Sequence, residues 1–318
     1  MKVFITRKIP EKGIEILKNN NIEIIINPHE RQLEKEEIIT YAQDCEAIIT
    51  LLSDKIDREL IDRLPKMKII ANYAVGYNNI DFNYCREKGI YVTNTPGVLT
   101  ETTADLGFAL ILSTARKIPQ SHIFTKHGMF KGWEPMLFLG HDVYGKTLGI
   151  IGLGRIGQAV AKRASGFSMN VLYYSPEKNV EGEKNTGAVH TDLENLAQKS
   201  DFIIITCPLT EKTKHMIDRK VLSKMKQTAI LINLARGPIV DEKVLIEFLK
   251  NDKIAGAGFD VYENEPEIPD ELKNLENVVI LPHIGSASYE TRTNMAVLSA
   301  QAVVSTLVKN EKPDITVW

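Results

Sequence analysis

The sequence predicts an α/β fold with two parallel sheets, each covered by helices. Short apolar runs rich in β-branched residues recur along the whole chain of 318 residues, and segments with helical periodicity separate them. Continuous rather than alternating apolar runs are typical of strands that are buried on both faces. A glycine-rich turn occurs near residue 150 and not near the N-terminus. Because such a turn opens a βαβ series of its own, a separate α/β unit must precede it.

The first part of the chain supplies a complete small sheet. Helical patterns lie between its strand candidates, so we expect parallel strands joined by right-handed crossovers. Five such strands are enough for a flavodoxin-like sheet. The candidates are VFIT (3–6), IEIIIN (22–27), AIIT (47–50), KIIANY (68–73) and IYVTN (90–94).

Two long helices frame the second part of the chain. Residues 101–116 predict a helix with Thr100 as its N-cap, and residues 288–308 predict another. The strand candidates between them are TLGIIG (147–152), NVLYYS (170–175), FIIIT (202–206), AILINL (229–234), IAGAGF (254–259) and VVIL (278–281).

These elements predict two domains. We expect a substrate-binding, flavodoxin-like domain at 1–99 plus 288–318 and a dinucleotide-binding Rossmann domain at 100–287. Two crossings of the chain would then leave an interdomain cleft, which is a favoured place for a ligand.

The composition is that of an ordinary globular protein and excludes several classes of function. Hydrophobic residues make up 43% and charged residues 25%, with a formal net charge of −2, so there is no basic field for nucleic acid or an anionic membrane. No apolar run reaches the roughly 20 residues of a membrane span, and the start MKVFITRKIP does not resemble a secretory leader. Three scattered cysteines (Cys45, Cys85 and Cys207) favour a reducing compartment, so we expect a cytoplasmic protein.

The glycine-rich turn matches the pattern G-x-G-x-x-G. Gly152 allows a tight turn after a strand, Gly154 lets the backbone approach a pyrophosphate, and Gly157 lets the following helix pack on the sheet. Backbone N–H groups and the positive end of the helix then face the phosphates. The flanking segments read as strand and helix, so the turn predicts a dinucleotide site.

The choice between NAD(H) and NADP(H) depends on the end of the next strand. NAD-binding units place an Asp or Glu there on the ribose 2′-hydroxyl, whereas this chain has Ser175. Ser175 could donate a hydrogen bond to a 2′-phosphate and Lys178 could supply charge, which favours NADP(H) or use of both cofactors. Glu177 and the lack of an arginine act against a phosphate.

Three ionisable residues stand at the ends of predicted strands: Arg236 in LINLARG, Glu265 in VYENEP and His283 in LPHIGSAS. Strand C-terminal ends are where an open α/β sheet binds its ligand. An arginine can hold a carboxylate with two hydrogen bonds, and a histidine can exchange the proton that accompanies hydride transfer. A nearby glutamate would favour the imidazolium form. Position alone leaves each of them equally compatible with an exposed or structurally paired side chain. The other histidines lack metal-ligand spacing, so no metal is expected.

Six segments, in this order, resemble the D-isomer-specific 2-hydroxyacid dehydrogenase family over essentially the whole chain. They are ANYAVGYNNID, NTPGVLTETTADL, GIIGLGRIG, LINLARG, GFDVYENEP and LPHIGSAS. The resemblance implies that Arg236 binds the substrate and polarises its carbonyl. It makes His283 the acid/base and Glu265 the partner of that histidine.

The resemblance also implies the remaining contacts of substrate and cofactor. It places the backbone N–H groups of Val75 and Gly76 on the substrate carboxylate, and Asp260 near the nicotinamide. An apolar pocket wall would be formed by Leu51, Leu52 and Phe138. Besides the three glycines, the residues implied along the cofactor groove are Thr103, Arg155, Ile156, Ser175, Cys207, Pro208, Thr213, Leu234, Ala235, His283 and Gly285.

Within this family, residues 131–157 most resemble the glyoxylate/hydroxypyruvate reductases. In that subgroup, the tryptophan that matches Trp133 reaches from the dimer partner's arm into the substrate pocket. An aromatic anchor at the dimer interface is the alternative role. The resemblance implies a homodimer that forms through the long helix and through an arm, residues 118–145.

The expected activity is reduction of a short 2-oxo acid, such as glyoxylate or hydroxypyruvate, to the D-2-hydroxy acid with NAD(P)H. One alternative is a D-3-phosphoglycerate dehydrogenase. Another is a non-catalytic, NAD(H)-sensing protein like the transcriptional corepressors that share the fold. The complete set of Arg236, Glu265 and His283 speaks against the corepressor. A formate dehydrogenase would have Gln in place of Glu265.

Overall fold

The structure, a computed structural model, describes all residues from 1 to 318 and divides the chain into two compact units. Unit 1 consists of Met1–Leu99 and Ser286–Trp318, and unit 2 consists of Thr100–Gly285. The chain passes between the two units after Leu99 and after Gly285. The sequence predicted the same first boundary and placed the second one after residue 287.

Unit 1 contains a five-stranded parallel sheet with the order β2-β1-β3-β4-β5. This is the order of a flavodoxin-like sheet, as predicted. Every predicted strand of this part is present. Strands β3 and β4 are buried throughout, whereas the edge strand β2 is at most half-buried. The strands are β1 (Lys2–Ile5), β2 (Glu23–Ile26), β3 (Ala47–Thr50), β4 (Ile69–Asn72) and β5 (Tyr91–Thr93).

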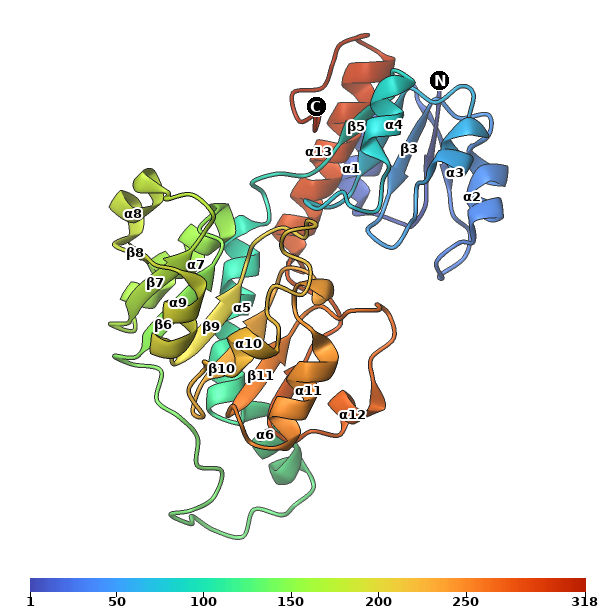
Figure 1. Ribbon diagram of the computed structural model, residues 1–318. Coiled ribbons are helices and arrows are strands. Elements are labelled where there is room, and N and C mark those ends of the chain that lie inside the picture. The colour runs from blue at the N-terminus through green and yellow to red at the C-terminus, as the bar shows by residue number, and fades with distance from the viewer. The chain divides into compact units, whose positions relative to one another are not determined.

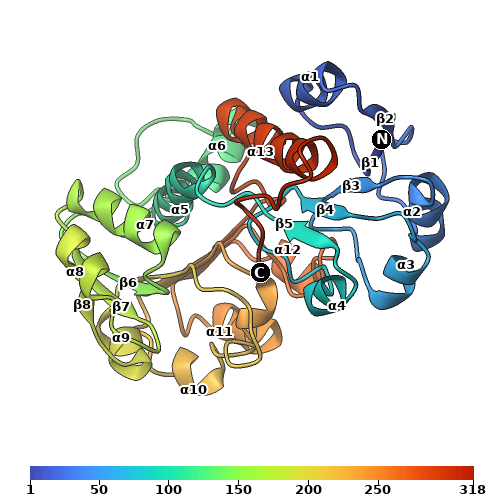
Figure 2. The same ribbon diagram turned by 90° about the horizontal axis from the view of Figure 1, so that it is seen from above.

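Helices cover both faces of this sheet (Figure 1). On one face, Phe4, Ile48 and Ile70 pack in a core with residues of α2, α3 and α4. On the other face, α13 lies against α1, β3 and β4, and Figure 2 shows α1 and α13 side by side. The helices of unit 1 are α1 (Glu11–Asn19), α2 (Lys35–Ala42), α3 (Arg58–Asp62), α4 (Phe82–Glu87) and α13 (Tyr289–Leu307).

Unit 2 contains a seven-stranded parallel sheet with the order β12-β11-β10-β9-β6-β7-β8. The order reverses between β6 and β9, which gives the Rossmann arrangement with one more strand. The short β8 is absent from the prediction because two residues make no apolar run. The strands are β6 (Thr147–Ile151), β7 (Asn170–Tyr174), β8 (Val189–His190), β9 (Phe202–Ile205), β10 (Ile230–Asn233), β11 (Gly256–Phe259) and β12 (Val278–Ile280).

Two cores hold unit 2 together, one on each face of its sheet. In β9, Phe202 and Ile204 pack with residues of α5 and α7, whereas Ile203 and Ile205 pack with residues of α9, α10 and α11. This explains the unbroken apolar run in the sequence of β9. The helices of unit 2 are α5 (Thr100–Ala115), α6 (Ile118–Lys126), α7 (Arg155–Ser165), α8 (Val180–Thr186), α9 (Leu193–Lys199), α10 (Arg219–Leu222), η1 (Gly237–Ile239), α11 (Glu242–Lys250) and α12 (Asp270–Lys273).

The two long predicted helices are present with small differences at their ends. Helix α5 begins at Thr100, so this residue is the first helical residue and not the predicted N-cap. A shift of one residue is common at helix ends, because the terminal turn is held by few hydrogen bonds. Helix α13 follows Ser288, whose hydroxyl accepts a hydrogen bond from the N–H of Thr291 and thereby caps it. No helix has the combination of length and apolar character that crossing a membrane requires.

Candidate active site

Most of the predicted site residues lie at one edge of the seven-stranded sheet. Segments with these residues follow β6, β7, β9, β10, β11 and β12. Because all strands of the sheet are parallel, their carboxyl ends share this edge. The glycine turn follows β6, at the point where the strand order reverses, which is the usual ligand site of such a sheet.

The structure explains two of the three glycines by the close approach of backbone segments. Gly152 has a φ of +101°, and a Cβ there would lie 2.8 Å from the backbone nitrogen of Cys207, which follows β9. At Gly157 a Cβ would lie 2.2 Å from the carbonyl oxygen of Gly152. A side chain at either position would therefore push apart β6, β9 and α7.

Gly154 is different, because a Cβ built there would meet no atom of the chain within 4 Å. It is the N-cap of α7, and no side chain caps this helix. The N–H groups of the first turn, which begins at the exposed Arg155 followed by Ile156, are therefore available to an anion. The open space at Gly154 and the uncapped helix end fit the pyrophosphate of a dinucleotide.

We expect Gly154→Ala to weaken NAD(P)H binding about tenfold without lowering the melting temperature. The added methyl group would enter the open space that the phosphates need, while it would touch no part of the protein. Fluorescence titration with NADPH and a thermal melt measure the two quantities. The contrasting variant, Gly157→Ala, should lower the melting temperature, because its Cβ would lie 2.2 Å from the carbonyl oxygen of Gly152. An unchanged dissociation constant for Gly154→Ala would contradict a phosphate site at this turn.

Ser175 follows β7, and its hydroxyl accepts a hydrogen bond from the N–H of Leu153 at 3.2 Å. The serine thus touches the glycine turn and keeps its own hydroxyl proton for another acceptor. Lys178, which we considered as a source of positive charge, pairs with Glu183 at 3.2 Å. This exposed pair reduces the charge that Lys178 can offer to a phosphate.

Asp260 follows β11 and is buried. Its carboxylate accepts hydrogen bonds of 2.7 Å from the N–H groups of Ile284 and Gly285. Burial raises the pKa of the Asp260 carboxyl, and these hydrogen bonds and the nearby His283 offset the rise only in part. Asp260 therefore fixes the segment that carries His283.

The other residues implied along the cofactor groove are grouped around the same sheet edge. Thr103, in α5, is buried and comes close to Gly285. The hydroxyl of Thr213 accepts a hydrogen bond from the N–H of Thr210 and donates one to the carbonyl oxygen of Pro208. Burial raises the pKa of the Cys207 thiol to about 11, so it stays neutral. Leu234 and Ala235 directly follow β10.

Glu265 and His283 form a hydrogen-bonded pair, although 18 residues separate them in the sequence. The Nδ1 atom of His283 lies 2.8 Å from Oε2 of Glu265, and the N–H of Tyr262 donates to Oε1 at 3.0 Å. His283 has a φ of +54°, a conformation that costs energy for a side chain of this size. Such strain is commonly found where surrounding structure holds a functional residue in place. The second ring nitrogen, Nε2, does not face the glutamate.

The charges around this pair support an ionised glutamate. Burial acts to raise the pKa of Glu265, but the hydrogen bond and charge of His283, the N–H of Tyr262 and the charge of Arg236 together lower it. Arg236 follows β10 in extended conformation and donates to the carbonyl oxygen of Ala235 at 2.7 Å. Burial lowers the pKa of the Arg236 guanidinium, and the charge of Glu265 opposes this change.

Two residues that hydrogen-bond to the segments of Arg236, Glu265 and His283 were not predicted from the sequence. The hydroxyl of Tyr262 donates to the carbonyl oxygen of Leu281 at 2.7 Å, so Tyr262 joins the segments of Glu265 and His283. The amide of Asn233 donates to the carbonyl oxygen of Arg236 at 3.0 Å and accepts from the N–H of Ala235. A polar amide at the end of the otherwise apolar β10 was the available signal for Asn233.

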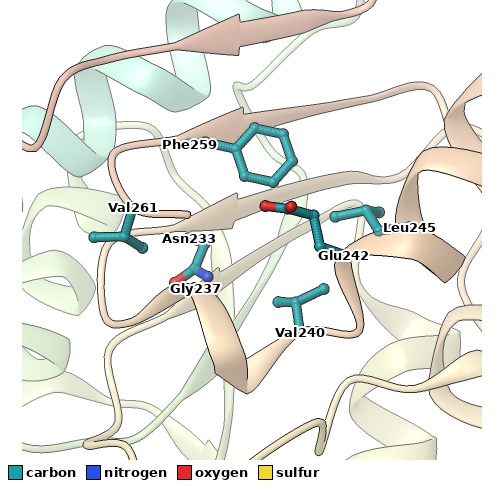
Figure 3. Close-up of a pocket in the computed structure, with 7 residues that line it drawn as sticks. All are labelled: Asn233, Gly237, Val240, Glu242, Leu245, Phe259 and Val261. Carbon is teal, nitrogen blue, oxygen red and sulfur yellow. The ribbon is translucent and has the colours of Figure 1, made fainter. Parts of the chain in front are cut away.

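Next to the ends of β10 and β11, a small pocket is lined by a buried acid, Glu242 (Figure 3). Its carboxylate lies below the ring of Phe259 and accepts a hydrogen bond from the N–H of Glu263. Burial raises the pKa of Glu242. Glu263 is two residues from Glu265, so Glu242 supports the segment that carries the candidate catalytic carboxylate.

The remaining predicted residues lie elsewhere. Val75, Gly76 and Leu52 belong to loops of unit 1 that follow β4 and β3. Trp133 is 83% exposed in the arm, and Phe138 of the arm packs edge to face against Phe124. No group of three His, Cys, Asp or Glu side chains is arranged to bind a metal ion.

Comparison with known proteins identifies the family. Residues 108–285 match the family model described as D-isomer specific 2-hydroxyacid dehydrogenase, NAD binding domain. The chain belongs to this family. It is 51% identical to a glyoxylate reductase of Thermococcus kodakarensis over 308 residues, which are 96% of this chain and 92% of the relative. A glyoxylate reductase of Pyrococcus horikoshii is 50% identical over the same shares of the two chains.

Solved structures with the same fold are similar to this chain as well. One is an NADPH-dependent glyoxylate/hydroxypyruvate reductase of Sinorhizobium meliloti in complex with NADP and malonate. It is 33% identical with a TM-score of 0.87, over 98% of this chain and 95% of the other. The predicted family, the α/β fold class and an NAD(P)-dependent oxidoreductase are thereby confirmed. The roles of individual site residues stay predictions.

Proposed function

We propose that the protein reduces glyoxylate or hydroxypyruvate to the D-2-hydroxy acid with NAD(P)H. One observation carries the proposal: the hydrogen-bonded pair of His283 and Glu265 lies at the same sheet edge as Arg236 and the glycine turn. About half of all residues are identical to those of glyoxylate reductases over nearly the whole chain, which supports the substrate class.

Each residue has a part that its surroundings favour. Arg236 binds the substrate carboxylate through its guanidinium and polarises the neighbouring carbonyl group. A nicotinamide cofactor held at the glycine turn would supply the hydride. His283 donates the proton to the carbonyl oxygen from Nε2, because Nδ1 faces Glu265. The carboxylate of Glu265 orients the ring and stabilises its protonated form. The N–H groups of Val75 and Gly76 bind the carboxylate as well.

Initial rates with four 2-oxo acids test this proposal. We expect NAD(P)H oxidation with glyoxylate and hydroxypyruvate to exceed that with pyruvate and phosphohydroxypyruvate. Preference for phosphohydroxypyruvate would indicate a D-3-phosphoglycerate dehydrogenase instead. Tight NADH binding with no turnover of any of the four acids would indicate a binding protein.

We propose that the enzyme accepts NADPH at least as well as NADH. No acidic side chain stands at the end of β7, and Ser175 keeps a hydroxyl proton for a 2′-phosphate. We expect Ser175→Asp to change the ratio of kcat/KM for NADPH over NADH about tenfold in favour of NADH, because a carboxylate repels the phosphate. Aspartate can still accept from the N–H of Leu153, so the turn stays intact. The same ratio in parent and variant would exclude Ser175 from this choice.

We also propose that the protein is a homodimer that forms through the arm, residues 118–145. The arm begins after α5 and leads into the sheet at β6 (Figure 1). It exposes a set of large apolar side chains, and clusters of this kind mark interfaces. They are Ile118, Ile123, Met129, Phe130, Trp133, Met136, Leu139 and Tyr144.

Light scattering after size-exclusion chromatography is expected to give twice the chain mass of 35.7 kDa. Replacing Phe130 and Met136 by serine should shift the equilibrium to the monomer, because both are more than half exposed in the single chain. The matched control is Val180→Ser, an exposed apolar residue of α8 outside the arm. A parent protein that elutes as a monomer would contradict the proposal.

We infer that the protein works in a reducing compartment, such as the cytoplasm. All three cysteines are free. Burial raises the pKa of Cys45 to about 11 and that of Cys85 to about 12, so both are kept as thiols. Secreted proteins more often use their cysteines in disulfides.

A further inference from the structure

A network of side-chain amides lies beneath the segment Ala74–Tyr77 in unit 1. We call Asn72, Asn79 and Asn94 the asparagine cluster. Asn72 ends β4 and is completely buried, and Asn94 directly follows β5. The cluster therefore stands at the carboxyl edge of the five-stranded sheet.

Three successive carbonyl groups of this segment are bound from within the protein. The oxygen of Ala74 accepts from the N–H of Thr95 at 2.8 Å. The oxygen of Val75 accepts from Nδ2 of Asn94 at 2.8 Å, and the oxygen of Gly76 accepts from Nδ2 of Asn72 at 2.7 Å. Asparagine side chains thus fix two of these three peptide groups.

These hydrogen bonds also determine the direction of the N–H groups. In a planar trans peptide the N–H points away from the carbonyl group of the same unit. The N–H groups of Val75, Gly76 and Tyr77 therefore point away from Thr95 and the two asparagines. They donate no hydrogen bond within the chain, although their residues are only half-buried. Adjacent N–H groups without protein acceptors form a site for an anion.

The same cluster fixes the neighbouring loop after β3. Nδ2 of Asn79 donates to the carbonyl oxygens of Leu51 and Asp54, both at 3.0 Å. The hydroxyl of Thr50, the last residue of β3, donates to Oδ1 of Asn72 at 3.1 Å. The loop that begins with Leu51 and the loop with the free N–H groups are therefore held together by one network.

We propose that Asn72 and Asn94 are positioning residues that aim the N–H groups of Val75, Gly76 and Tyr77 at the substrate carboxylate. This inference rests on the proposed function and adds Tyr77 as a third donor. Donors held in place before binding lose less entropy when the anion arrives. Without the asparagines the peptide groups would be free to rotate, and their carbonyl oxygens would repel the anion.

The test uses oxalate, a carboxylate of the size of glyoxylate that accepts no hydride. Its dissociation constant is measured by calorimetry on the enzyme saturated with NADPH, for the parent and for two variants. Asn72→Leu keeps the size of the buried side chain, whereas Asn94→Ala changes a half-exposed position that tolerates substitution better. The matched control is Asn27→Leu. Asn27 is another buried asparagine, and its amide donates to the backbone of Thr6 and Arg31 in the loop after β2.

We expect both variants to bind oxalate about tenfold more weakly and NADPH within about twofold of the parent. Asn27→Leu should leave both constants unchanged, even where it lowers the melting temperature. Oxalate binding within about twofold of the parent in Asn94→Ala, or in a folded Asn72→Leu, would overturn the inference. A parent enzyme that reduces no 2-oxo acid would overturn the proposed function itself, whereas an active parent with unaffected variants would overturn only the role of the asparagines.

Discussion

Replacing His283 by asparagine is expected to lower kcat for 2-oxo acid reduction about 100-fold or more. Asparagine accepts the positive φ of this position better than other residues and can still hydrogen-bond to Glu265. The substitution therefore removes the proton donor and leaves the backbone as it is. Steady-state rates with glyoxylate, together with the dissociation constant of NADPH, measure the effect. Parent turnover in the folded variant would rule out His283 as the proton donor.

Glu265→Gln serves as the control that keeps the shape of this pair and removes its charge. The pKa of Glu265 is lowered, so its side chain is fully ionised above the ordinary carboxyl range. The negative charge disappears only when the pH falls through the lowered pKa. Rate changes above the ordinary carboxyl range therefore do not come from titration of Glu265. We expect Glu265→Gln to lower kcat for glyoxylate reduction at neutral pH, because the ring of His283 loses the negative charge that it faces at 2.8 Å.

The second large effect is expected from Arg236→Ala, which should raise KM for glyoxylate about 100-fold. The guanidinium can hold the substrate carboxylate with two charge-assisted hydrogen bonds, and its removal leaves that anion without them. NADPH binding should stay within about twofold, because the glycine turn is formed by other segments.

Arg236→Lys separates charge from geometry. Lysine keeps the positive charge but offers no planar pair of donors, so we expect a KM between those of the parent and Arg236→Ala. A KM for glyoxylate that is unchanged in both variants would show that the arginine has only a structural role, such as its hydrogen bond to Ala235.

The fold class was predictable because the strands are marked by unbroken apolar runs. Leu231 and Ile232 of β10, for example, pack into cores on opposite faces of the sheet, so both positions had to be apolar. The same rule fails for β8, where Val189 is exposed and the strand has only two residues. The end of β6 was predictable as well, because only glycine fits at position 152, where a Cβ would lie 2.8 Å from the backbone nitrogen of Cys207.

The interactions among the site residues could not be derived in the same way. Position at the strand ends selected Arg236, Glu265 and His283, but their roles came from the family resemblance. Hydrogen bonds such as the one from Tyr262 to Leu281 depend on backbone paths that no periodicity reveals. Asn72 was missed because a single amide at a strand end resembles any polar residue at the start of a loop.

The most direct test of the central claim is the configuration of the product formed from hydroxypyruvate. The enzyme is incubated with hydroxypyruvate and NADPH, and the glycerate is resolved by chiral chromatography and compared with the amount of cofactor oxidised. Reduction by a D-isomer-specific enzyme predicts one D-glycerate for each NADPH consumed. Formation of L-glycerate, or no glycerate with either NADPH or NADH, would contradict the proposed function.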